Sequence, residues 1–242
     1  MKNPNGPYPG RQIFIGRTPA GLPAFAYLVT GRSPASRERR AVPRDSGVIM
    51  GPIDNTPYDW LRHYTAVKYD NAIGFLTVSN GIQTEAVYET YRLLYHCGTR
   101  PARGYFKKVM DGANYEPDSL RTPRIAGIVM TPPGKNREPL YLLGIKEAGA
   151  PAYAWELTFD PGALGCVSTY AGDMAQPEPF KADDGPSALA IDAETPKDLA
   201  NFIYEISAAQ NNGEDIRVTA VAGVRQPDGL AWKLFHLNRH GD

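Results

Sequence analysis

Residues 115–129 read YEPDSLRTPRIAGIV, and in this stretch a polar turn runs directly into an apolar segment. The first ten of these residues include two carboxylates, two arginines and two prolines. The prolines restrict the backbone around the charges, and residues 125–129 are typical of a buried strand. Charge at the mouth of a buried strand is costly unless it is paired or binds something. The stretch therefore indicates either an ion-paired surface turn or a binding site.

Most other apolar segments are predicted to be strands joined by turns. Three hairpins are expected, in which 12–16 pairs with 23–30, 63–69 with 72–78, and 216–224 with 230–237. Four single strands are also expected, at 125–129, 140–145, 152–159 and 165–170. Many hairpins and few helices argue against a parallel βαβ fold. The pattern predicts a single α+β domain, residues 1–242, with two mainly antiparallel sheets packed together and helices covering the outside.

Three helices are predicted, at 84–97, at 103–110 and from Thr195 onward. The first has one apolar face, made of Ala86, Val87, Thr90, Leu93, Leu94 and Cys97. The last begins with a threonine cap, Pro196 and Asp198. Its apolar face comprises Leu199, Phe202, Ile203, Ile206 and Ala209, and Asn212-Gly213 ends it. Residues 171–194 are expected to form a long exposed connection.

Composition favours a cytoplasmic protein without metal or redox centres. The formal net charge is zero, which gives no indication of nucleic-acid or membrane-surface binding. The two cysteines and four histidines lack the spacing of a ligand set, and two cysteines suit a reducing compartment. No apolar segment is long enough to span a bilayer, and the N-terminal residues lack the apolar core of a signal peptide.

Two further segments carry groups that bind ligands in other proteins. Four of the nine residues 32–40 are arginines. The segment is predicted to be either a solvated basic loop or an anion site. An anion site is considered because the guanidinium fork matches phosphate oxygens. Ser79-Asn80-Gly81 lies between a predicted buried strand and a predicted helix start. That position commonly holds binding groups in layered folds.

Taken in order, these motifs resemble those of the archaeal-type IMP cyclohydrolase family over nearly the whole chain. The matching motifs are Gly10-Arg11, Gly16-Arg17, Ala26-Tyr27, Arg32-Ser33, Pro57-Tyr58, Ser79-Asn80-Gly81, Tyr115-Glu116, residues 122–126 and Ser168-Thr169-Tyr170. None is specific alone, but their order and spacing together are. The resemblance implies a four-layer αββα sandwich of the kind found in N-terminal-nucleophile hydrolases, and a possible homo-oligomer.

The resemblance also implies a reaction and a purine ribonucleotide substrate. The reaction closes the ring of 5-formamidoimidazole-4-carboxamide ribotide to inosine monophosphate with loss of water, the last step of purine synthesis. An enzyme for this reaction must hold the reacting groups together, stabilise charge on the formyl oxygen and move protons. No step calls for a cofactor.

Motif matching suggests a role for each of seven residues. Glu116 would position or deprotonate the carboxamide, Tyr64 would donate toward the formyl oxygen, and Arg37 would be their electrostatic partner. Arg17, Arg32 and Arg124 would bind phosphate and ribose, and Asn80 would bind the carboxamide or the base edge. The residues alone favour the other interpretation in each case: Tyr64 would be a core tyrosine, and Glu116 would simply pair with Arg121 or Arg124.

The chain also departs from these families. It starts Met1-Lys2, so no N-terminal nucleophile is expected, and cyclisation needs none. Extra residues occur around 65–72, 131–138 and 171–194, and Arg121 stands where the resemblance predicts asparagine. Two alternatives to the cyclohydrolase remain: a related amide hydrolase that activates water in the same pocket, and a non-catalytic purine-nucleotide-binding relative.

Overall fold

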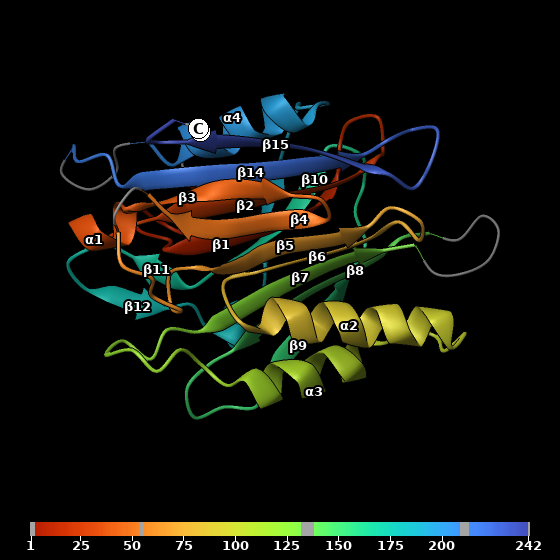
Figure 1. The fold of residues 1–242 in the computed structure, drawn as a ribbon, viewed down its shortest axis with the longest axis horizontal. Helices are drawn as coiled ribbons and strands as arrows, with labels where there is room; N and C mark the ends of the chain where they lie inside the picture. The colour runs from red at the N-terminus through yellow and green to blue at the C-terminus, as the bar shows by residue number, and fades with distance from the viewer. Residues whose placement is uncertain (1–2, 54–55, 132–137, 209–212, 242) are drawn as a thin grey trace.

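The computed structural model describes residues 3–53, 56–131, 138–208 and 213–241 (Figure 1). These residues form an α+β protein with two antiparallel sheets, of six and seven strands, and four α-helices. The prediction of two packed antiparallel sheets is therefore confirmed. Within the described ranges, no helix has the length and apolarity needed to cross a membrane.

The six-stranded sheet has the strand order β13-β10-β1-β2-β14-β15. Its strands are β1 (Arg11–Arg17), β2 (Pro23–Thr30), β10 (Ala163–Ser168), β13 (Ser187–Ala190), β14 (Arg217–Arg225) and β15 (Trp232–Asn238). The predicted first and last hairpins are both confirmed, as β1–β2 and β14–β15. Strand β2 also pairs with β14, which joins the two ends of the chain in the middle of this sheet.

The seven-stranded sheet runs in simple sequence order from β3 to β9. Its strands are β3 (Arg39–Arg44), β4 (Gly47–Pro52), β5 (Tyr64–Asp70), β6 (Phe75–Ser79), β7 (Arg124–Met130), β8 (Leu140–Lys146) and β9 (Tyr153–Leu157). Strands β11 (Tyr170–Gly172) and β12 (Pro177–Pro179) form a separate small ribbon. The β5–β6 hairpin confirms the predicted pairing of 63–69 with 72–78, although the turn extends over residues 71–74.

The two sheets stack face to face, with helices on both outer faces (Figure 1). Helices α2 (Gln83–His96) and α3 (Arg103–Ala113) cover the seven-stranded sheet. Helix α4 (Pro196–Ile206) covers the six-stranded sheet. The remaining helix, α1 (Pro34–Arg37), is a single turn. Side-chain alternation along a strand explains the layers. Ile13 and Ile15 of β1 pack between the sheets, whereas Phe14 packs toward α4.

Local structure differs from the predictions in two segments. The exposed connection predicted at 171–194 contains β12, a short 3-10 turn (Ala182–Asp184) and β13, which completes one edge of the six-stranded sheet. The basic loop predicted at 32–40 contains α1 and the start of β3, and the β3–β4 hairpin was not predicted. Apolar periodicity is weak in β3, RRAVPR, because one of its two buried positions, Arg39, is occupied by a charged residue.

The buried face of α2 also differs from the predicted one. Leu93, placed on the predicted apolar face, is 64% exposed. Tyr88 and Tyr91 are buried instead and pack on Phe75 of β6, with ring centroids 5.3 and 6.3 Å away. The large aromatic rings take the sheet-facing side because they bury more apolar surface than leucine.

Helix α4 begins as predicted. The Thr195 side chain accepts a hydrogen bond from the Asp198 amide, and Pro196 occupies the first turn. The helix ends at Ile206, earlier than the predicted Asn212-Gly213. Ala209 and Asn212 lie outside the described residues.

Candidate active site

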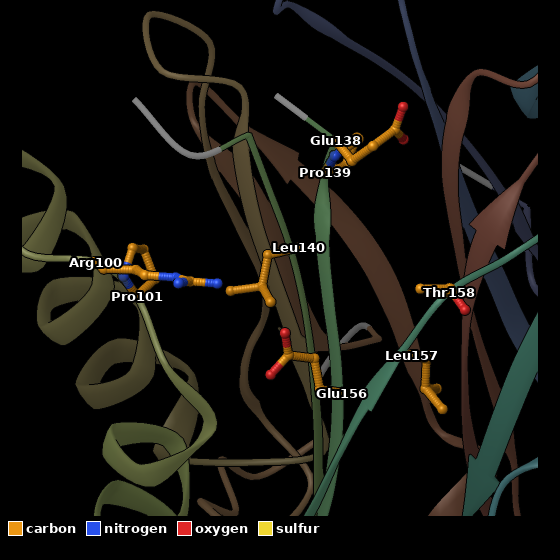
Figure 2. Close-up of a pocket in the computed structure, with 8 residues that line it drawn as sticks. All are labelled: Arg100, Pro101, Glu138, Pro139, Leu140, Glu156, Leu157 and Thr158. Atoms are coloured by element: carbon orange, nitrogen blue, oxygen red, sulfur yellow. The ribbon is translucent and has the colours of Figure 1, made fainter. Parts of the chain in front are cut away.

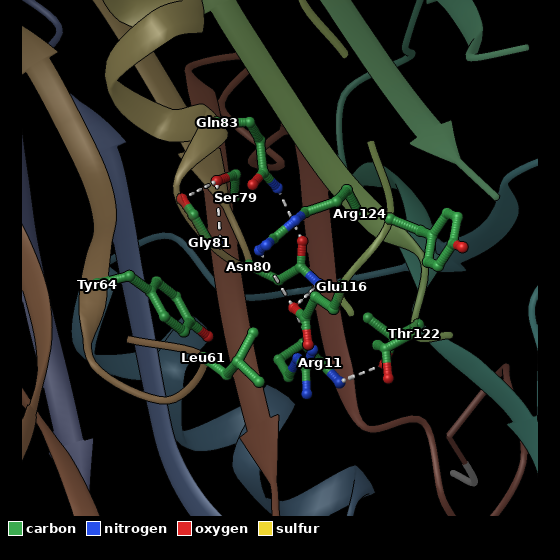
Figure 3. Close-up of polar contacts among 12 residues, drawn as sticks. Arg11, Leu61, Tyr64, Ser79, Asn80, Gly81, Gln83, Glu116, Thr122 and Arg124 are labelled. Carbon is green, nitrogen blue, oxygen red and sulfur yellow. Dashed lines mark hydrogen bonds and ion pairs between the residues drawn. The ribbon is translucent and has the colours of Figure 1, made fainter. Parts of the chain in front are cut away.

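Four segments that are distant in the sequence bring charged and amide side chains together at one end of the space between the sheets (Figure 3). Arg11 begins β1, Asn80 follows β6, Glu116 follows α3 and Arg124 begins β7. Glu116, only 2% exposed, is at the centre. Its Oε1 accepts from Arg11 Nη2 at 2.6 Å, Asn80 Nδ2 at 3.0 Å and Arg124 Nη1 at 3.4 Å.

The turn between α3 and β7 fixes the position of Glu116. The Glu116 amide donates to the Thr122 carbonyl at 2.8 Å, and the Asp118 carboxylate accepts from the Thr122 amide at 2.8 Å. Within this turn Arg121 has φ 49°, in the left-handed region. Asparagine adopts that region more readily than arginine, which gives a physical reason for the asparagine that the family resemblance predicts there.

Asn80 braces the cluster with all of its amide atoms. Its Oδ1 accepts from the Ile125 amide and from Gln83 Nε2, both at 2.8 Å. Its Nδ2 donates to Glu116 and, at 2.9 Å, to the Pro123 carbonyl. Both amide hydrogens are thereby used within the protein. The structure thus gives Asn80 a positioning role, and a donor contact from Asn80 to substrate would require one of these bonds to break.

Glycine is required next to Asn80. A Cβ on Gly81 would collide with the Arg124 guanidinium. Arg124 is 1% exposed and is the largest of the fully buried side chains. The Ser79-Asn80-Gly81 motif therefore has two effects: Asn80 holds Glu116, and Gly81 leaves space for the buried side chain of Arg124.

The electrostatics of the cluster favour a basic carboxylate held beside cations. Burial raises the pKa of Glu116 above the ordinary carboxyl value, and Arg11 and Arg124 oppose that rise. Burial also lowers the pKa of Arg124, against the opposing effect of Glu116. Burial alone would lower the pKa of Arg11, but Glu116 and nearby tyrosines raise it well above its usual value.

One oxygen of Glu116 is committed to the protein and the other is available. The three side-chain hydrogen bonds that the described residues make to Glu116 all end on Oε1. Glu116 also lines a cavity of about 250 Å³. Oε2 is thus the atom through which this carboxylate can act on a ligand in the cavity.

Tyr64, at the start of β5, points from its strand toward this cluster (Figure 3). Its hydroxyl lies 2.7 Å from the hydroxyl of Tyr27 on β2, so the pair bridges the two sheets. Burial raises the pKa of Tyr27 well above its usual value, and Tyr27 is therefore a neutral hydroxyl. Tyr64 is 7% exposed and Tyr27 is fully buried, so Tyr64 is the member of the pair nearer to solvent.

The cavity is rich in arginine. Arg11, Arg32, Arg39 and Arg62 line it, together with the acids Asp59, Glu116 and Asp118. Its wall also includes Tyr8 and Tyr170, whose rings stack with centroids 5.6 Å apart. Guanidinium groups beside a stacked aromatic pair suit a ligand that combines an anionic group with a flat ring.

The structure brings five of the seven residues predicted for the site into one region and adds others. Glu116, Asn80 and Arg124 are in contact, and Tyr64 points toward them. Arg32 lines the cavity. Arg37 instead pairs with Glu214 at 2.5 Å and is not part of the cavity wall.

Arg17 lies at the other end of β1 from Arg11. The strand has seven residues, which corresponds to about 20 Å at roughly 3.3 Å per residue. Arg17 pairs there with Glu138, and the structure does not bring it to the cluster.

Sequence reasoning assigned no role to Arg11, Arg39, Tyr27 or Gln83. Two of these, Arg11 and Tyr27, belong to motifs that carry the family resemblance, Gly10-Arg11 and Ala26-Tyr27, so the signal was present but unassigned. Arg39 lies in the arginine-rich segment and is only 2% exposed. Arg32 and Arg39 are the two arginines of that segment that line the cavity, and the anion-site interpretation stays a prediction.

A second hollow, of about 420 Å³, lies elsewhere on the molecule (Figure 2). It is lined by Arg100, Pro101, Glu138, Pro139, Leu140, Glu156, Leu157 and Thr158. None of the seven predicted site residues contributes to it. The smaller cavity next to Glu116 is therefore the better candidate for the active site, because buried ionisable groups with shifted pKa values gather there.

Comparisons with known proteins agree with the motif resemblance. Residues 8–229 match the family model described as IMP cyclohydrolase-like protein. Over 206 residues the chain is 28% identical to the IMP cyclohydrolase of Methanocella arvoryzae, covering 83% of this chain and 87% of that protein. The IMP cyclohydrolase of Natronomonas pharaonis is 29% identical over 183 residues, 74% of this chain and 84% of that protein.

A higher identity covers a shorter region. The chain is 35% identical to the IMP cyclohydrolase of Methanocaldococcus jannaschii over 127 residues, which is 50% of this chain and 56% of that protein. The chain thus matches little more than half the length of that relative, whereas the two longer alignments cover most of both partners.

Proposed function

The chain belongs to the IMP cyclohydrolase-like family, and from this premise we propose that it is an IMP cyclohydrolase. The proposed reaction closes 5-formamidoimidazole-4-carboxamide ribotide to inosine monophosphate and releases water. The observation that carries the proposal is the buried Glu116, held on one oxygen by two arginines and Asn80, with its other oxygen available to the arginine-lined cavity.

The reaction needs no nucleophilic side chain. The carboxamide nitrogen attacks the formyl carbon of the same molecule, the new carbon–nitrogen bond closes the ring, and the formyl oxygen leaves as water. Both reacting groups are attached to one imidazole, so the site must first hold them in the reactive rotamer. Two protons must then reach the departing oxygen, one from the carboxamide nitrogen and one from the formamido nitrogen.

Glu116 is proposed to take the proton from the carboxamide nitrogen. A general base works best when its pKa approaches the working pH, and burial raises the pKa of Glu116 in that direction. Arg11 and Arg124 hold Oε1 in a fixed direction, which leaves Oε2 to accept the proton.

Tyr64 is proposed to donate toward the formyl oxygen. Tyr27 can donate its own proton to the Tyr64 oxygen across 2.7 Å, which leaves the Tyr64 hydrogen free to point at the substrate. A donor that is already oriented stabilises developing negative charge without reorganisation cost. Arg37 remains a prediction as an electrostatic partner, since its ion pair is with Glu214.

The phosphate is proposed to lie against Arg32 and Arg39. Both line the cavity. They carry guanidinium forks that match phosphate oxygens. Arg124 is buried behind Glu116 and supports the carboxylate in this arrangement.

The layered architecture supports an assignment to the N-terminal-nucleophile hydrolase type of αββα sandwich. Its two stacked antiparallel sheets and outer helices match what the resemblance implies. A cyclisation does not depend on an N-terminal nucleophile, so the proposed reaction is compatible with that fold. A homo-oligomeric assembly is also proposed, from the family resemblance alone.

The direct test is to incubate the purified protein with the formamido ribotide and to follow inosine monophosphate by chromatography. Product is expected without added metal, folate or nucleoside triphosphate. Equal rates with and without protein would contradict the proposal and favour a binding protein. Release of formate and the amino ribotide would favour the amide hydrolase instead.

Replacing Arg32 with alanine is expected to weaken binding of inosine monophosphate by about 1.5–3 kcal/mol, the range for a hydrogen bond to a charged group. Binding of inosine, which has no phosphate, should weaken much less. Calorimetric titration of both ligands measures the difference. Arg44→Ala is the matched control, because Arg44 is an exposed arginine at the far end of β3. Equal losses for nucleotide and nucleoside would show that Arg32 does not bind the phosphate.

The rate is expected to fall on acidification, at a pH above the ordinary carboxyl range. A base must be deprotonated to act, so activity is present above the pKa of Glu116 and is lost as pH falls through it. Because burial raises that pKa, the acid limb of kcat/KM should lie above the unperturbed value for glutamate, about 4.3. A pH–rate profile measures the limb, and a limb at or below the unperturbed value would contradict the assignment of Glu116 as the base.

A further inference from the structure

Four buried hydrogen-bond donors without a partner among the described residues lie at the opposite end of the sandwich from the candidate active site. They are the Nε atoms of Arg17 and Arg225, the indole Nε1 of Trp232 and the hydroxyl hydrogen of Tyr141, whose oxygen interacts with Arg17. A buried donor with no acceptor costs free energy, and folded proteins contain few of them. The described residues hold ten buried side-chain atoms without a partner, and four of them lie here. Their convergence around two arginines indicates a missing acceptor.

Strand ends bring these side chains together. Arg17 ends β1 and Arg225 ends β14. The guanidinium carbon of Arg17 lies 6.0 Å from the centroid of the Tyr141 ring. Trp232 is directly opposite Arg225 in the β14–β15 register, so both side chains are on the same face of the sheet. Trp232 packs in the core between the sheets, as does Tyr141.

The charges at this end are not balanced. Burial lowers the pKa of Arg225, and the nearby positive charge of Arg17 lowers it further. The carboxylate next to them is Glu138, which pairs with Arg17 and is 80% exposed. Such an exposed partner stabilises a cation only weakly. Arg225 bonds instead to the neutral hydroxyl of Thr131.

We propose that Arg17, Arg225, Tyr141 and Trp232 form an oxyanion site, the distal basic site, which takes a small dianion of the phosphate type. All four unpartnered groups are donors, and two guanidinium groups are the preferred partners of phosphate oxygens. Because Glu138 is exposed and compensates the arginines only weakly, a dianion would supply most of the negative charge opposite them, whereas a water molecule accepts few hydrogen bonds and brings no charge. The site is separate from the candidate active site and does not depend on the proposed cyclohydrolase activity.

Indole resonances offer a direct test, because the chain has three tryptophans. Inorganic phosphate is titrated into nitrogen-15-labelled protein at constant ionic strength, and the assigned indole N–H signals are followed. The Trp232 signal is expected to shift and saturate, while that of Trp155, on the edge strand β9, stays in place. Trp60, whose neighbours Asp59 and Leu61 line the candidate active site, reports separately on binding there.

Variants at the two arginines complete the test. Arg225→Gln and Arg17→Gln are each expected to weaken the phosphate response of Trp232 about tenfold or more. The exposed control Arg44→Gln should leave it unchanged. Acetate, a monoanion, should give a weaker response than phosphate.

An unchanged Trp232 signal would overturn the distal basic site. The same conclusion follows if chloride at matched ionic strength shifts Trp232 as much as phosphate does, or if both glutamine variants bind phosphate like the wild type. Equal responses to acetate and phosphate would overturn the dianion assignment.

Discussion

Replacing Glu116 with glutamine is expected to lower the rate constant at saturation by about two to three orders of magnitude. Glutamine keeps the shape of the side chain and can still accept hydrogen bonds from Arg11 and Asn80, but it cannot take a proton from the carboxamide. If Glu116 acts mainly in the transition state, affinity for inosine monophosphate should change little. Steady-state kinetics and product titration on the same preparation measure both quantities.

The same substitution also distinguishes a role of Glu116 in proton transfer from a purely structural role in the turn. It leaves the buried guanidinium groups of Arg11 and Arg124 without a charged partner, and breaking a buried ion pair costs about 3–5 kcal/mol of stability. The rate must therefore be normalised to the folded fraction, determined by thermal unfolding. Glu205→Gln is the control, because it removes an exposed partner of Arg217 and neither residue lines the cavity. A lower melting temperature with normal turnover in folded protein would mean that Glu116 only braces the turn.

Replacing Tyr64 with phenylalanine is expected to reduce the same rate constant by about two orders of magnitude or more, the range for loss of one oxyanion donor. The change removes one hydroxyl and almost no volume, so the packing of β5 should survive. Product affinity should again be nearly unchanged, since the formyl oxygen has left as water. Single-turnover measurements with the formamido ribotide isolate the ring-closing step.

A control tyrosine outside the cavity shows whether loss of a tyrosine hydroxyl lowers the rate only when that hydroxyl lies at the site, or simply because the protein becomes less stable. The hydroxyl of Tyr91 donates to the Ala102 carbonyl at 2.7 Å, under helices α2 and α3. Tyr91→Phe therefore removes a buried hydrogen bond without touching the cavity, and its turnover should equal that of the wild type. If Tyr64→Phe also turns over normally, Tyr64 is a core tyrosine and the proposed mechanism loses its donor.

Sequence patterns predicted the two-sheet architecture because the information is local. Hairpins such as β1–β2 and β14–β15 are encoded by neighbouring apolar runs and a turn between them. Strand β13 was missed because its four residues, SALA, are too few and too small to show a period. The face of α2 was mispredicted because both faces carry apolar residues, and only the ring of Phe75 opposite the helix decides between them.

The composition of the site was harder to predict than the fold. Gly10-Arg11 and Gly16-Arg17 are the same dipeptide at the two ends of one strand, and six positions apart they lie on the same face. Nothing in β1 itself says which arginine approaches Glu116. That choice depends on how the second sheet docks, which places Glu116 at one end of β1 and Glu138 at the other.

The burial of Arg11, Glu116 and Arg124 also constrains the order in which this chain can fold. The contact between Arg11 and Glu116 joins residues 105 positions apart, so its loop-closure entropy must be overcome before the ion pair forms. Each charge is costly to remove from water unless its partner is already present. Local hairpins can form without these charges meeting, but docking of the sheets cannot be completed without them. The Glu116 cluster is therefore assembled at the step that closes the sandwich, and a chain whose sheets have not docked lacks the candidate active site.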